Sequence, residues 1–292
     1  MGFENDTNNK PRKYENIGAT AALVAYYRAF SDIPFAREVS EAIEAKEIAK
    51  EIIVDDEAHL AKVLVAFEAR FKSVDAVLKK YPHITRIIEI PAGFSTRGVT
   101  MTAANPAIKY IECDLPAILQ EKQKLVAELF PSTNKGEKPN LQFCAASVLD
   151  FEQLRKVASN LDVGPIAVIT EGLFSYLTPQ EKAVVAKNVH TLLTEHKGIW
   201  VVTDLTRIFK PNDSKAAELR GRISTKTGFS PITGCFASVS EARKYFERFG
   251  FTVHDYRRSE VITSLSTCKT SKLTRWEIEE LLEPQATFAL EV

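Results

Sequence analysis

Short apolar runs, many of them β-branched, alternate along the chain with longer segments in which apolar residues recur every three or four positions. The short runs predict strands buried on both faces of a parallel sheet, and the longer segments predict helices that cover it. Strands are predicted over 87–90, 108–112, 141–145, 166–170, 198–204, 251–256 and 286–292. Helices are predicted over 18–30, 35–50, 57–81, 115–130, 151–161, 238–249 and 275–282, with two more beginning near 96 and at 178. This alternation predicts an α/β fold with a doubly wound sheet.

The stretch after the first predicted strand has the features of a ligand-binding turn. Pro91 ends the strand, because a central strand cannot do without a backbone N–H. Gly93 lets the backbone approach a ligand closely, and Ser95 or Thr96 can cap the next helix. Asp114 follows the second predicted strand and lies 21 residues after Gly93, near the spacing at which an acidic side chain meets ribose hydroxyls. Together the two stretches predict a nucleotide-binding crevice.

Composition and charge place the chain among ordinary globular proteins. Its 292 residues, 45% apolar and 26% charged, can bury a large core within one domain. Lys plus Arg and Asp plus Glu are both 38, so no net field attracts nucleic acid or an acidic membrane. No apolar run approaches the roughly 20 residues that span a bilayer, and the N-terminus lacks the apolar core of a signal peptide. The four cysteines have no metal-like spacing, so we expect a cytoplasmic protein with reduced thiols and no metal site.

Three motifs, in order along the chain, give a more specific indication. They are Glu89-Ile-Pro-Ala-Gly-Phe-Ser-Thr-Arg-Gly98, Tyr110-Ile-Glu-Cys-Asp-Leu-Pro116 and Thr170-Glu-Gly-Leu-Phe-Ser-Tyr-Leu-Thr-Pro-Gln-Glu181. They resemble the first, second and fourth S-adenosylmethionine motifs of the leucine carboxyl methyltransferase family, which includes TcmP-like O-methyltransferases of polyketide pathways. The segment from Thr20 to Ala29 resembles the family's N-terminal cap helix. The chain departs from the family pattern at Pro91, in place of the first Gly, and at Ser95, in place of Asp.

The resemblance implies a class I methyltransferase fold, which is a Rossmann-like sheet of seven strands with an N-terminal helical cap and a lid insertion. A single domain would then cover 14–292, after a mobile N-terminus over 1–13. Within the domain we expect the cap over 14–82, the core over 83–204, the lid insertion over 205–237 and the closing strands over 238–292.

The resemblance also implies S-adenosylmethionine as the cofactor and gives roles to residues of the crevice. Arg70 would hold the cofactor carboxylate with the planar fork of its guanidinium. Glu171 would contact the methionine part, where a carboxylate can hold the α-ammonium. Ser147 stands where the family has an Asp at the adenine edge. Further cofactor contacts are expected at Ala92, Gly93, Asp114, Leu115 and Val148.

Two tyrosines are candidate catalytic residues, each with a simpler alternative. Tyr176 would line the reacting end of the cofactor, or would pack with its hydroxyl on a carbonyl oxygen. Tyr27 would offer an aromatic face to the positively charged sulfonium, or would belong to the core. Arg70 could likewise form an ordinary salt bridge. Asp150 is expected to cap the helix over 151–161 rather than to bind a ligand.

The five histidines fall in no recognised motif, and this bears on the reaction. A hydroxyl acceptor usually needs a general base, whereas a carboxylate is already a nucleophile. The resemblance implies an O-methyltransferase that acts on the carboxylate or hydroxyl of a small molecule in secondary metabolism, and the lack of a histidine motif favours a carboxylate acceptor or a nucleophile that belongs to the cofactor itself. Cyclisation of S-adenosylmethionine to azetidine-2-carboxylate and methylthioadenosine is an alternative, as is cofactor binding without turnover. A NAD-dependent oxidoreductase is disfavoured, because the Gly-x-Gly-x-x-Gly fingerprint is absent. The sequence gives no indication of the oligomeric state.

Overall fold

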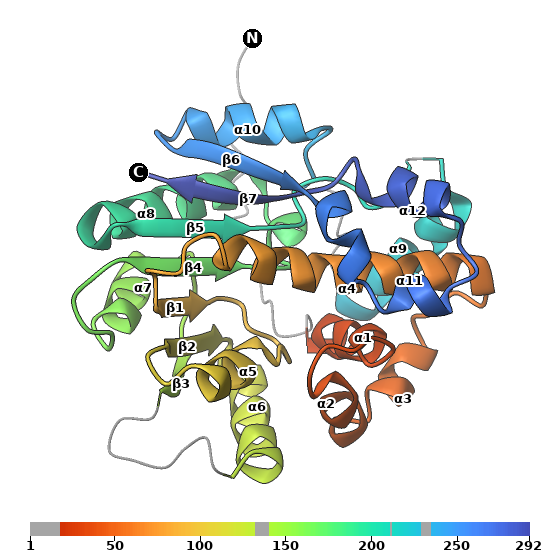
Figure 1. Ribbon diagram of the computed structural model, residues 1–292, viewed down its shortest axis with the longest axis horizontal. Coiled ribbons are helices and arrows are strands. Elements are labelled where there is room, and N and C mark those ends of the chain that lie inside the picture. The colour runs from red at the N-terminus through yellow and green to blue at the C-terminus, as the bar shows by residue number, and fades with distance from the viewer. Residues whose placement is uncertain (1–17, 132–139, 211, 229–234) are drawn as a thin grey trace.

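The computed structural model of the protein describes residues 18–131, 140–210, 212–228 and 235–292. Within them a sheet of seven strands has the order β3-β2-β1-β4-β5-β7-β6 (Figure 1). Strands β1 to β5 are parallel, whereas β7 is antiparallel to both of its neighbours, β5 and β6. The predicted Rossmann-like fold of class I methyltransferases is confirmed, including the antiparallel pair that closes the sheet.

The observed elements lie close to most of the predicted ones. The strands are β1 Arg86–Glu89, β2 Lys109–Asp114, β3 Leu141–Ala145, β4 Ile166–Thr170, β5 Gly198–Val202, β6 Thr252–Arg257 and β7 Ala286–Glu291. The α-helices are α1 Gly18–Arg28, α2 Ala36–Ala42, α3 Ala45–Lys50, α4 Glu57–Leu78, α5 Arg97–Ala104, α6 Pro116–Leu129, α7 Phe151–Ala158, α8 Pro179–His196, α9 Ser214–Thr227, α10 Val239–Glu247, α11 Thr267–Thr270 and α12 Arg275–Leu282. Short 3₁₀ helices cover Phe174–Tyr176 and Arg258–Ser264.

Helices cover both faces of the sheet, so each face has a core of its own. On one face α7, α8 and α10 pack against the strands, with Leu154, Trp200 and Phe246 fully buried in one cluster. On the other face α4, α5 and α6 pack on the sheet, with Val74 and Val126 in the same cluster. Every residue of β4 is buried, as expected for a central strand covered on both sides.

The first helices form a cap beside the sheet. Figure 1 shows α1, α2 and α3 together beyond the carboxyl ends of β1 and β4, where α1 also packs against α4. The single helix predicted over 35–50 is wrong: it is two helices, because Glu44 has a left-handed φ of 49° that interrupts the helical hydrogen bonding.

Two regions without predicted structure are helical. Within 205–237, of which 211 and 229–234 lie outside the described residues, α9 packs against α1 of the cap. Residues 214–227 are therefore an ordered helix packed on the cap. After β6, a 3₁₀ helix and α11 lie along α4.

Two further expectations concern the N-terminus and membrane-spanning segments. The expected mobile N-terminus over 1–13 lies outside the described residues. None of the helices in the described ranges has the length and apolar character that crossing a membrane requires.

Candidate ligand-binding site

A cavity of about 310 Å³ lies between the cap and the carboxyl ends of the parallel strands. This edge is where doubly wound sheets bind ligands, and ligand pockets usually have volumes of about 300–1,000 Å³. The cavity is lined by nine of the ten predicted site residues, namely Arg70, Ala92, Gly93, Asp114, Leu115, Ser147, Val148, Glu171 and Tyr176. Tyr27 is the exception.

The turn after β1 brings backbone to the cavity wall. Gly93 has a φ of 48°, a conformation that costs any residue with a Cβ about 1–2 kcal/mol. The N–H of Ala92 donates to the carbonyl of Cys113 over 2.8 Å, which holds the turn against β2. The predicted use of a glycine at this turn thus follows from its backbone conformation.

Asp114 is buried at the end of β2 and is fixed by two backbone groups. Its Oδ2 accepts a hydrogen bond from the N–H of Gly93 at 2.6 Å, and its Oδ1 accepts one from Leu115 at 2.7 Å. Burial raises the pKa of Asp114, and these two bonds oppose the shift. Each carboxylate oxygen has a second acceptor position, so the side chain can still bind ligand hydroxyls in the cavity.

The segment after β3 contributes Ser147 and Val148 to the wall. The N–H of Ser147 donates to Oε1 of Gln153 at 3.0 Å, and its Oγ accepts from Leu149 at 3.3 Å. Asp150 caps α7 by accepting from the N–H of Gln153, as predicted. The capping carboxylate therefore serves the helix and not the cavity.

Glu171, at the end of β4, is surrounded by three arginines. Arg70 Nε donates to its Oε1 at 2.8 Å, Arg97 Nη2 donates to its Oε2 at 3.0 Å, and Arg28 also pairs with Oε1. Burial alone raises the pKa of Glu171, but the three guanidinium groups outweigh it and hold that pKa well below its usual range. Glu171 is consequently an anion at any physiological pH.

Asp204, just after β5, is a second buried anchor with a strained backbone. It has a φ of 61°, unusual for a residue with a Cβ, and accepts from the N–H of Gly172 at 2.8 Å. Its carboxylate pairs with Arg70 at 3.1 Å and with Arg258 at 3.0 Å. Arg70, which was predicted to bind a ligand, is thus shared between Glu171 and Asp204.

These pairs belong to one arginine–carboxylate network with equal numbers of each charge. Arg97 also pairs with Asp75 at 2.7 Å and with Glu89 at 2.5 Å. The network has four arginines and four carboxylates, namely Arg28, Arg70, Arg97, Arg258, Asp75, Glu89, Glu171 and Asp204. Arg70 Nη2 makes no hydrogen bond to a described residue, so this arginine keeps a donor for a ligand.

The two candidate catalytic tyrosines have different positions. Tyr176 lines the cavity, where burial raises its pKa and a hydrogen bond to Thr20 opposes the shift. Tyr27 does not line it: its ring lies in the core of the cap, 5.1 Å from the ring of Phe67, and burial raises its pKa. The expectation that Tyr27 faces the reacting centre is corrected, because the apolar side of α1 that carries it packs inward.

The structure adds members that the sequence analysis did not name as site residues. Arg28, Arg97, Arg258 and Asp204 are all buried among the charges of the network. A sequence signal existed for Arg97, which belongs to the first motif, but its buried partners come from distant segments. For Arg28 the sequence indicates only that it belongs to the expected cap helix.

A different group of residues forms the wall of the cavity next to α9. Leu219 and Ile223 of α9 pack with Leu23 and Phe209, and all four line the cavity. Arg207 and Arg220 lie in the same part of the wall. In the described ranges, no group of three or more His, Cys, Asp or Glu is arranged to hold a metal ion.

Comparisons with known proteins support the fold and go no further. No family model matches the chain, and no curated protein matches it. A DUF574 family protein from Streptomyces avermitilis is similar, with a TM-score of 0.61 and 15% identity over 93% of this chain and 96% of that one. The mitomycin 7-O-methyltransferase MmcR has a TM-score of 0.49 and 10% identity over 96% and 73% of the two chains. The methyltransferase domain of bacterial CtHen1 has a TM-score of 0.49 and 11% identity over 77% and 98%. The first of these shows that the fold is shared over almost the whole of both chains.

Proposed function

We propose that the protein binds S-adenosylmethionine in the cavity and transfers its methyl group to a small molecule. The observation that carries this proposal is the convergence of Gly93, Asp114 and Glu171 at one edge of a sheet with methyltransferase topology. Among the similar structures, MmcR is a methyltransferase by name, which agrees with the proposal at the level of reaction class.

The residues present fit the three parts of this ligand. Asp114 has acceptor positions for the ribose hydroxyls, and the neutral Ser147 can meet the adenine edge. Glu171, ionised by its arginines, can accept from the α-ammonium. Arg70 can donate from Nη2 to the carboxylate. When bound, S-adenosylmethionine supplies a methyl group on a positively charged sulfur.

The chain's own contribution to the reaction is to bind, to orient and to exclude water. Tyr176 and Phe67 present aromatic surface in the cavity, and aromatic faces attract cations. No histidine of the described residues lines the cavity, and the carboxylates of Glu171 and Asp204 are held by arginines, so the wall offers no obvious general base. An acceptor that is already ionised, such as a carboxylate, fits this site best.

Cyclisation to azetidine-2-carboxylate is a second candidate, and the size of the cavity favours it. A volume of about 310 Å³ is at the lower limit for ligand pockets, and cyclisation needs no room for a second substrate. The nucleophile would be the α-amine, which attacks only when unprotonated, so the rate would rise with pH. Binding without turnover is the remaining alternative.

Product analysis separates these reactions. Purified protein is incubated with S-adenosylmethionine alone, and then with a mixture of small carboxylic acids and phenols. We expect S-adenosylhomocysteine and a methylated product only when an acceptor is present. Methylthioadenosine formed from S-adenosylmethionine alone would mean that the reaction is cyclisation and not methyl transfer. Binding of S-adenosylhomocysteine with no product in either incubation would indicate a protein without turnover.

A further inference from the structure

We propose that the small-molecule substrate carries a carboxylate, which Arg207 and Arg220 bind beside α9. This inference rests on the proposed function and specifies its acceptor. It starts from an imbalance of charge: this part of the cavity wall has two guanidinium groups and no described carboxylate that pairs with either.

The neighbouring cations show that the imbalance is specific to the cavity. The segment 207–226 contains six basic residues, and four of them are paired. Lys210 pairs with Glu280 at 2.6 Å, Lys215 with Glu218 at 3.8 Å, Arg222 with Glu218 at 2.7 Å, and Lys226 with Glu51. None of these four lines the cavity, whereas Arg207 and Arg220 do. Neither Arg207 nor Arg220 makes an ion pair or hydrogen bond with any described residue.

Arg207 and Arg220 are close enough to repel each other. Burial and the charge of Arg207 lower the pKa of Arg220, and Asp213 opposes the shift. Asp213 itself caps α9 by accepting from the N–H of Ala216 at 2.9 Å. Asp204, a carboxylate of the network that also lines the cavity, is already bound by two arginines. An anion placed between Arg207 and Arg220 would relieve their repulsion and gain charge-assisted hydrogen bonds.

The surroundings of the pair indicate what the rest of the ligand is like. Leu219 and Ile223 lie on the same helix as Arg220, and with Leu23 they give the cavity an apolar wall. A molecule that fits both features has an apolar body and a terminal carboxylate. S-adenosylmethionine also carries a carboxylate, which would compete with that of the substrate for Arg207 and Arg220. Arg70 has a donor available for the cofactor, which leaves Arg207 and Arg220 for the substrate.

Binding of decanoate and of its neutral amide, decanamide, tests the inference with S-adenosylhomocysteine present at saturation. For the wild-type protein we expect decanoate to bind about tenfold more tightly than decanamide, as for a charge-assisted pair of about 1.4 kcal/mol. The double variant Arg207→Gln, Arg220→Gln should lose this preference and keep its affinity for S-adenosylhomocysteine within about twofold. The matched control Arg222→Gln, on the same helix but outside the cavity, should keep the preference. If the double variant does not fold, Arg207→Gln alone, at an exposed position, should lose part of it.

Three results would overturn the inference. They are equal binding of decanoate and decanamide by the wild-type protein, an unchanged preference in the double variant, and a large loss of affinity for S-adenosylhomocysteine in that variant. The last result would mean that the pair holds the cofactor's carboxylate. If S-adenosylhomocysteine does not bind the wild-type protein at all, the proposed function fails separately. The decanoate and decanamide comparison, repeated without it, then still decides the inference.

Discussion

Two sets of arginines differ in their partners; Arg28 and Arg70 line the cavity in the first set, and Arg207 and Arg220 line it in the second. Arg28, Arg70, Arg97 and Arg258 are buried among four carboxylates, whereas Arg207 and Arg220 have no carboxylate partner among the described residues. A buried charge is tolerated only when it is paired, and an unpaired one is tolerated where water or a ligand reaches it. The first set therefore builds the site, and the second set leaves a position for an anion.

The paired set also explains how the cap is held on the sheet. Arg28 comes from α1 and Arg70 from α4, and both pair with Glu171 at the end of β4. Arg258, from the segment after β6, reaches Asp204 at the end of β5. The network thus joins five segments that are far apart in the sequence: α1, α4, the ends of β4 and β5, and the segment after β6.

The largest loss of stability is expected when Glu171, the central anion of the paired set, is removed. Glu171→Gln leaves Arg28 without a carboxylate partner among the described residues and removes one partner each from Arg70 and Arg97. The loss of one member of a buried ion pair costs about 3–5 kcal/mol. Urea denaturation at pH 7 measures this loss in the free energy of unfolding. A loss under about 1 kcal/mol would mean that the network contributes little to stability.

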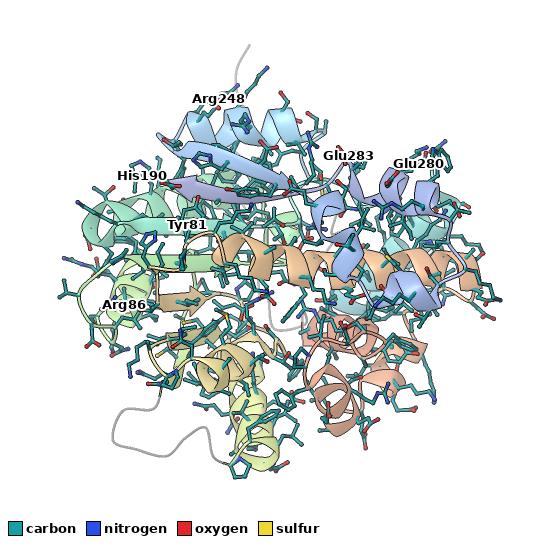
Figure 2. All side chains as sticks on the ribbon, viewed as in Figure 1. Tyr81, Arg86, His190, Arg248, Glu280 and Glu283 are labelled. Carbon is teal, nitrogen blue, oxygen red and sulfur yellow. The ribbon has the colours of Figure 1, made fainter. Side chains whose placement is uncertain are left out.

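The pH dependence and a control variant sharpen the same test. Because the folded-state pKa of Glu171 lies well below the value of about 4.3 in the unfolded chain, its stabilisation is complete above pH ~4.3 and is lost as the pH falls toward the folded-state pKa. The difference between wild type and variant should therefore shrink near pH 3. Glu280→Gln is the control: Figure 2 labels Glu280 at the periphery on α12, where it pairs with Lys210, and such surface pairs contribute about 0–1 kcal/mol.

Arg70→Lys should have the next largest effect, and it tests the shared arginine of the paired set. One ammonium group cannot replace the fork that reaches both Glu171 and Asp204, so we expect a loss of stability of about 1.5–3 kcal/mol. Calorimetric titration with S-adenosylhomocysteine should also give about tenfold weaker binding, if Nη2 holds its carboxylate. Unchanged binding by a folded variant would remove Arg70 from the cofactor site.

Gly93→Ala tests the turn that borders the paired set, with a smaller expected effect. The φ of 48° predicts a loss of about 1 kcal/mol, and the added Cβ would lie 3.5 Å from the Cβ of Ala21. Gly228→Ala is a matched control, because Gly228 has a φ of 74° and open space around it, outside the cavity. Both variants should lose similar stability, but only Gly93→Ala should weaken binding of S-adenosylhomocysteine. Equal binding by the two variants would place the ligand elsewhere.

Arg220→Gln should have the smallest effect on stability, which is the sharpest contrast with the paired set. Since this guanidinium has no carboxylate partner among the described residues and is repelled by Arg207, its removal should change the free energy of unfolding by less than about 0.5 kcal/mol. Urea denaturation of the wild type and of the variant measures this difference in the free energy of unfolding. A loss of 2 kcal/mol or more, above the usual range for a surface change of about ±0.5 kcal/mol, would mean that Arg220 belongs to a structural network.

The sequence predicted the parts of the site that depend on local order along the chain. Gly93, Asp114 and Glu171 follow three strands that were recognised from their apolar runs, and parallel strands bring their carboxyl ends to one edge. The helix predicted to begin at 178 is confirmed, and its start is a local feature, because Thr178 and Glu181 form a capping box within one turn of helix.

The remaining features depend on contacts that no local pattern records. Arg28 lies 143 residues before its partner Glu171, so nothing near Arg28 indicates that it is buried and paired. The helix α9 has only three buried residues, Ala216, Leu219 and Thr227. Its apolar side is therefore too narrow to produce a clear helical periodicity of apolar residues in the sequence. Tyr27 was assigned by the aromatic character of α1, which does not distinguish the inner side of a cap helix from the side that faces a ligand.

Calorimetric titration with S-adenosylhomocysteine, S-adenosylmethionine and NAD tests the central claim most directly. We predict that the wild-type protein binds the first two and not NAD. We also predict that Asp114→Ala weakens binding of S-adenosylhomocysteine by about 1–3 kcal/mol. The variant lacks the carboxylate oxygens that accept from the ligand and from the N–H groups of Gly93 and Leu115. Binding of NAD without any response to S-adenosylhomocysteine would contradict the account, as would an Asp114→Ala protein that binds S-adenosylhomocysteine as tightly as the wild type does.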